Sequence, residues 1–192
     1  MPRIIEYPIA LETLEKRGFV CNYFNGGAFG FPKGVDVTIL GWIATDDPTI
    51  RPQLRSHIRI IPPPAEENMA GGAMIASDLE LPGPAWIMPL SHWAFELDFG
   101  SKKWLPELIQ SIDIDPQLLA SRSDASHIEF EGAERTTLMR FVQKLLEQLT
   151  LSDFMLAFPP HPILCTIHHH KQLWWVSPDE TLIRKISGNT PI

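Results

Sequence analysis

Three short apolar segments follow one another closely in the C-terminal part of the chain and most constrain its fold. They span residues 153–158, 162–170 and 173–177. Short runs rich in aromatic and β-branched residues predict strands, and the last two are close enough to form a hairpin. We also expect a hairpin between residues 19–24 and 35–43, which a glycine-rich stretch connects. Strands in runs, with few helices between them, predict an α+β fold in which helices pack mainly on one face of an antiparallel or mixed sheet.

The strongest helix signal lies just before these strands. In residues 134–149 the apolar side chains recur at the spacing of one helical face, and they are Leu138, Phe141, Val142, Leu145 and Leu149. This spacing gives one apolar stripe, with polar side chains on the opposite side. We therefore expect this helix to lie across the sheet.

Residues 92–99 alternate between apolar and polar side chains and therefore predict a strand. Period two over eight residues is typical of a strand with one face on the core and the other facing water. The wetter face would carry His92, Glu96 and Asp98. These three side chains are candidates for a site, although a solvated sheet face is the simpler interpretation.

The chain has 192 residues, enough to bury one core, and we expect a single domain over residues 1–192. Proline and glycine are concentrated around residues 62–83, where we predict an exposed loop. A loop of this length is a natural candidate for a lid or a partner contact.

The net charge and the hydropathy of the sequence argue against several classes of protein. The formal net charge of −7, without a local cluster of basic residues, does not favour nucleic-acid binding. No segment approaches the roughly 20 apolar residues that cross a bilayer, and no secretory signal is evident, so we expect a cytoplasmic protein without a membrane partner. Cys21 and Cys165 are far apart in the chain and do not indicate a disulfide framework.

Three consecutive histidines, His168, His169 and His170, end one of the predicted strands. Strand alternation would place His168 and His170 on one face, where the two imidazoles can share a divalent metal ion. Such a pair needs further ligands, and we predict that His92 supplies one, while Glu96 or Asp98 completes the shell or acts as a base on a bound water. The alternative interpretation is a hairpin end without a metal.

The adjacent Trp174 and Trp175 must point to opposite faces of a strand, so at most one enters the same core. The other can anchor an interface, where tryptophan is favoured. We therefore expect a non-catalytic protein-interaction or self-associating module, such as a homodimer. The alternative is a metal-dependent hydrolase that uses the His-x-His pair, so the sequence leaves open whether the protein is an enzyme. No motif indicates a known family.

Overall fold

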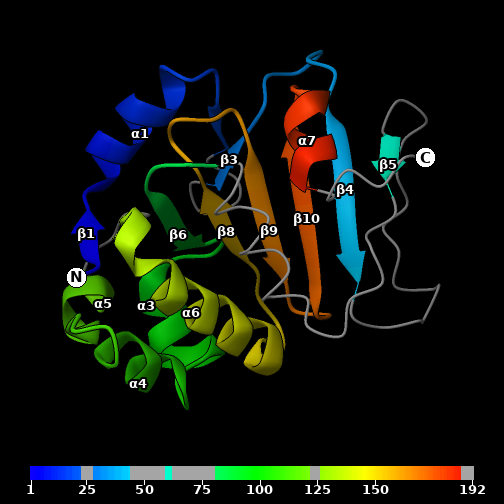
Figure 1. Cartoon of the computed structure of the whole chain (residues 1–192). Coiled ribbons are helices and arrows are strands. Elements are labelled where there is room, and N and C mark those ends of the chain that lie inside the picture. The colour runs from blue at the N-terminus through cyan, green and yellow to red at the C-terminus, as the bar shows by residue number, and fades with distance from the viewer. Residues whose placement is uncertain (23–27, 44–58, 62–80, 122–125, 187–192) are drawn as a thin grey trace.

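The centre of the structure is one eight-stranded sheet (Figure 1). The computed structural model of the chain describes residues 1–22, 28–43, 59–61, 81–121 and 126–186. From one edge to the other, the strands are β1 (Arg3–Ile5), β7 (His127–Phe130), β6 (Ala85–Pro89), β8 (Phe154–Ala157), β9 (Leu164–His168), β10 (Gln172–Ser177), β4 (Thr38–Ile43) and β5 (Arg59–Ile61). Neighbours are antiparallel, except that β4 and β5 are parallel. The predicted α+β fold with a mixed sheet is confirmed.

Most of the described helices pack on one face of this sheet. They are α6 (Arg135–Gln148), which follows the short η4 (Gly132–Glu134), α7 (Glu180–Ile186), and the short α3 (Trp93–Phe95), η3 (Glu96–Gly100), α4 (Leu105–Gln110) and α5 (Pro116–Ala120). The predicted stripe of α6 is buried against Ile128, Phe154 and Cys165 of the sheet in one continuous apolar core. The helix predicted over residues 134–149 is therefore confirmed, and it crosses the sheet in Figure 1.

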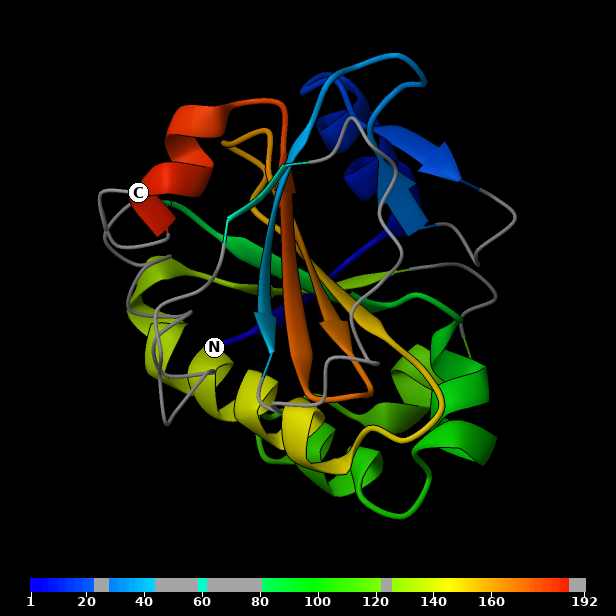
Figure 2. The same cartoon turned by 90° about the vertical axis from the view of Figure 1, so that its right-hand side faces the viewer.

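The opposite face is covered only over part of its width by other described elements. Helix α1 (Tyr7–Glu15) and the hairpin of β2 (Val20–Asn22) and β3 (Ala28–Gly30) form a second, smaller apolar cluster with the sheet. Leu14 and Phe29 meet Trp86 and Met155 there. Figure 2 shows α1 and this hairpin on the side of the sheet away from α6 and α7.

The strand predicted for residues 92–99 is wrong, because this segment forms α3 and η3. The His92 side chain caps the first turn by accepting a hydrogen bond from the backbone N–H of Phe95 at 3.1 Å. In an alternating pattern, apolar residues that are two positions apart are also found four positions apart. Residues four apart lie on the same side of a helix, so the pattern fits a helix as well. Trp93 and Leu97 are accordingly buried, whereas Phe95 and Phe99 are exposed.

The hairpin predicted between residues 19–24 and 35–43 is also wrong. β2 pairs instead with β3, which lies inside the glycine-rich connection. β4 pairs with β10 and β5 in the large sheet, where Leu40 enters the main core. Beside β10, Leu40 is fully buried in the main core, and burial of apolar surface favours this pairing.

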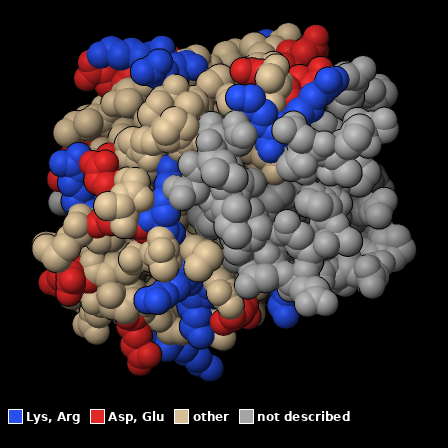
Figure 3. All heavy atoms as spheres, in the orientation of Figure 1, with Lys and Arg blue, Asp and Glu red and all other residues tan. Residues whose placement is uncertain are grey.

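The predicted loop, the cysteines and the charged surface can each be compared with the described residues. Most of the loop predicted at 62–83 lies outside the described residues, and Leu81 at its described end is buried. The described part of the chain contains no helix whose length and hydropathy would let it cross a membrane. Cys21 and Cys165 are both free thiols. Basic and acidic side chains are interspersed among the described residues of the face shown in Figure 3.

Candidate metal centre

The three consecutive histidines lie at the turn between β9 and β10, so the predicted hairpin is confirmed. His168 pairs with Gln172, which leaves a three-residue loop of His169, His170 and Lys171. Lys171 has a φ of 59°, the left-handed conformation that closes the common three-residue hairpin loop. Because the chain turns directly after His168, the alternation of strand faces stops there. His168 and His170 therefore do not form the predicted pair on one strand face.

The turn nevertheless brings all three imidazoles together. The ring centroids of His168 and His169 are 4.3 Å apart, and those of His169 and His170 are 4.2 Å apart. One ring nitrogen from each of the three residues can be chosen so that all lie within 4.8 Å of one another. A tetrahedral zinc ion with Zn–N bonds of about 2.0–2.1 Å needs nitrogens roughly 3.4 Å apart. Rotation of the side chains would have to close the remaining gap.

Asp153 is the carboxylate that contacts this cluster, and the sequence analysis did not single it out. It directly precedes β8, whose first residue pairs with Ile167 of β9. Its Oδ1 accepts hydrogen bonds from the backbone N–H of His169 at 3.0 Å and from His169 Nδ1 at 2.8 Å. Its Oδ2 lies 3.7 Å from His168 Nε2. The available signal was an acidic residue at the start of the predicted strand at 153–158, which precedes the histidine strand in the sequence.

These contacts set the proton positions on two of the imidazoles. A carboxylate accepts in this contact, so His169 carries a proton on Nδ1, and Nε2 keeps a lone pair when the ring is neutral. His168 Nδ1 accepts from the backbone N–H of His170 at 3.2 Å, so its proton lies on Nε2, toward Asp153. A carboxylate that fixes the tautomer of an imidazole is the usual outer partner of a metal-binding histidine.

Burial lowers the pKa of His168 below its ordinary value. The Asp153 carboxylate acts in the opposite direction, and the charges of protonated His169 and His170 lower the pKa further. A lowered pKa keeps His168 neutral at neutral pH. Neutral imidazole is the form that binds a metal ion.

The other predicted site residues do not join the histidines. Among the described residues, the only group of three or more convergent His, Cys, Asp or Glu ligands is the histidine turn itself. His92 is exposed and caps α3, and Asp98 is exposed on η3. The arrangement predicted from a strand at 92–99 therefore does not form, because the segment is helical.

Glu96 has no exposed surface, and three serine hydroxyls donate hydrogen bonds to its carboxylate. Ser91 Oγ lies 2.6 Å from Oε1, while Ser152 Oγ and Ser101 Oγ lie 2.8 and 3.1 Å from Oε2. The carboxylate is thus enclosed by the protein in a position where a catalytic base would have no access to solvent.

Trp174 and Trp175 point to opposite faces of β10, as the sequence predicts. Trp175 is fully buried in the main core and stacks on Phe158 with ring centroids 5.7 Å apart. Trp174 is 8% exposed, and its Nε1 donates to Gln172 Oε1 at 2.8 Å. Neither indole presents an appreciable surface to a partner in this structure, although both were predicted as interface candidates.

Comparisons with known proteins do not assign the chain to a family. No protein-family model matches it, and neither the curated proteins nor the solved structures contain a match.

Proposed function

We propose that the chain binds a divalent transition-metal ion at the β9–β10 turn. The observation that carries this proposal is the convergence of His168, His169 and His170 on one point beside Asp153. Imidazole nitrogen suits zinc, nickel and copper, whereas calcium and magnesium prefer oxygen ligands.

Each histidine contributes differently to the proposed site. His169 presents an Nε2 lone pair, because Asp153 accepts the proton on Nδ1. A metal at His168 would replace either its contact from the backbone of His170 or the proton that faces Asp153. His170 is exposed, so its ring can turn toward the ion at little cost. The half-buried rings of His168 and His169 supply the fixed part of the site.

Three imidazoles leave at least one coordination position for water. A metal ion lowers the pKa of such a water and makes it a nucleophile near neutral pH. A metal-dependent hydrolase is therefore the reaction class that this ligand set would serve, with the three-histidine turn in place of the His-x-His strand pair. Asp153 is the carboxylate of this proposed site, as an outer partner of the histidines, in place of Glu96 or Asp98, which the sequence predicted as a ligand or a base.

Metal titration of tag-free protein tests the proposal. We expect calorimetry to show one zinc or nickel ion per chain, with the affinity weakened about 10–100-fold in Asp153→Asn, the range for losing an outer partner of a ligand. His169→Ala should weaken binding further, because it removes a ligand. His161→Ala is the matched control, because His161 binds the backbone oxygen of Pro82 instead. Equal affinities for the wild type and all three variants would rule out the site.

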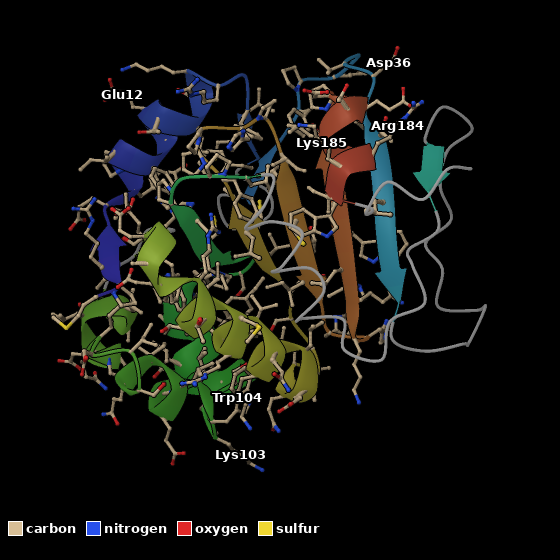
Figure 4. The ribbon with its side chains drawn as sticks, in the orientation of Figure 1. Glu12, Asp36, Lys103, Trp104, Arg184 and Lys185 are labelled. Atoms are coloured by element: carbon tan, nitrogen blue, oxygen red, sulfur yellow. The ribbon has the colours of Figure 1, made fainter. Side chains whose placement is uncertain are left out.

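A second candidate function is self-association through another apolar surface. Phe99 and Phe95 are 71% and 41% exposed, with ring centroids 6.1 Å apart. Leu118, on the neighbouring α5, is 52% exposed. Clustered exposed apolar side chains are typical of interaction sites. Lys103 and Trp104 lie at the same end of the molecule, and Lys103 points outward (Figure 4).

Sedimentation over a concentration series tests this second function. We expect a dimer whose dissociation constant rises at least tenfold, about 1.4 kcal/mol, when Phe95 and Phe99 are both replaced by serine. Ile9→Ser is the control, because Ile9 is 56% exposed and lies on α1, on the other face of the sheet. A wild-type chain that stays monomeric at high concentration would exclude self-association.

A further inference from the structure

We propose that Glu96 is a positioning residue for the Asp153–His169 pair and acts through Ser152. This inference deepens the proposed metal site and rests on it for its functional meaning. Glu96 itself is fully buried and is not one of the side chains that converge at the turn, so its effect on the site would pass through the chain segment that it holds.

The Glu96 carboxylate is buried and depends on hydrogen bonds from the protein. A buried carboxylate is costly unless hydrogen bonds replace its lost water. In the described part of the chain, Glu96 has no ion-pair partner, and the hydroxyls of Ser91, Ser101 and Ser152 provide its hydrogen bonds. A Cβ at Gly100 would come within 2.7 Å of Glu96 Oε2, so the glycine leaves the room that the carboxylate occupies.

The three serines lie at the ends of described helices and strands. Ser91 follows β6, Ser101 follows η3, and Ser152 precedes β8. Ser91 and Ser101 lie within five residues of Glu96, whereas Ser152 lies 56 residues away, so the carboxylate joins its own segment to the start of β8. Glu96 and Ser101 are also joined by the 2.8 Å backbone hydrogen bond of a π-helical turn, a rare element that recurs at functional sites.

Ser152 is connected to the histidines through Asp153. Asp153 is the next residue, and its backbone oxygen accepts from the N–H of Leu90 at 2.9 Å. Ser152 and Asp153 are thus held on one side by Glu96 and β6. On the other side, the Asp153 carboxylate accepts both hydrogen bonds from His169. A carboxylate can fix an imidazole only if its own segment is fixed, which is the task assigned to Glu96.

Zinc affinity in two single variants and their combination tests the inference. Ser152→Ala and Glu96→Gln should each raise the zinc dissociation constant about 3–10-fold, less than the 10–100-fold expected for Asp153→Asn. If Glu96 acts through Ser152, the zinc dissociation constant of the double variant should equal the larger of the two single-variant values. Ser152→Thr, which keeps the hydroxyl, should restore affinity. Additive losses would overturn the proposed route.

A matched control separates positioning from general loss of stability. Ser177 is a buried serine at the far end of β10, and its hydroxyl donates to the backbone oxygen of Pro162 at 2.7 Å. The same hydroxyl accepts from the backbone N–H of Asp179 at 3.0 Å, so Ser177→Ala removes at least as much hydrogen bonding as Ser152→Ala, away from the turn. We expect it to leave zinc affinity within twofold of the wild type. A loss equal to that of Ser152→Ala would show that the effect is only structural and would overturn the inference.

A measurement on metal-free protein distinguishes failure of this inference from failure of the proposed function. The Nδ1 proton of His169 should give a downfield nuclear magnetic resonance signal while Asp153 holds it. The signal should broaden or disappear in Ser152→Ala and persist in Ser177→Ala. If the wild type binds no zinc but shows this pattern, the metal function fails and the positioning stands. If both variants keep the signal, the positioning fails.

Discussion

Replacing Trp175 by alanine is expected to lower the free energy of unfolding by about 3–5 kcal/mol, the usual cost of removing a large buried aromatic side chain. Trp175 is fully buried and stacks on Phe158. Its loss removes apolar contact and leaves a cavity that the surrounding core can only partly fill. Urea denaturation followed by circular dichroism measures the change.

The stabilities of Trp175 and Phe99 variants distinguish this core role from the interface role predicted for Trp175. Phe99→Ala removes a large aromatic ring that is 71% exposed, and it should change stability by no more than about 0.5 kcal/mol. Trp175→Phe should recover a substantial part of the loss. If Trp175→Ala instead altered the oligomeric state and left the unfolding free energy unchanged, the buried position of the indole would be wrong.

The second large effect is expected at Gly41 in β4. A Cβ at this position would collide with Cζ3 of Trp174 and lie 2.7 Å from Cη2, so the indole lies directly over the glycine. Trp174 is itself almost fully buried and cannot simply move into water. We expect Gly41→Ala to cost about 2–3 kcal/mol, toward the upper end of the usual cost of overpacking.

Two further variants make this prediction specific. Gly132→Ala is the matched control, because a Cβ there meets nothing within 4 Å, and it should stabilise the protein by a few tenths to about 1 kcal/mol. In a Trp174→Ala background the clash is gone, so Gly41→Ala should become nearly neutral, and the two substitutions should not be additive. An equal cost of Gly41→Ala with and without the indole would contradict the close contact.

Local patterns were sufficient to predict the parts of the fold that depend on neighbours in sequence. The apolar stripe around Leu138 and Phe141 predicted α6, and the short spacing between residues 162–170 and 173–177 predicted the β9–β10 hairpin. The segment at 92–99 was misread because apolar residues two apart are also four apart. β6 was missed, because its five residues follow a proline- and glycine-rich stretch and are buried on both faces without alternation.

The candidate site was harder to predict, because its decisive contact is between strands. The run of histidines was visible in the sequence, yet the left-handed Lys171 determines that all three rings converge instead of alternating. Asp153 carries no motif, and only the pairing of β8 with β9 places it beside His169. Similarly, the polarity of Glu96 suggested a solvated base, whereas two serines of its own segment and the distant Ser152 enclose it.

The strand order also has a consequence for how the chain folds during synthesis. β4 takes its place in the sheet beside β10, and β1 beside β7, each of which is made more than a hundred residues later. Contacts so distant in sequence are slow to form, because a long loop must close before any of them is gained. β1, and the edge of β4 that faces β10, must therefore wait with their backbone hydrogen-bonding groups unpaired until these distant partners are translated. This interval is the one in which the nascent chain most needs protection from wrong strand pairing.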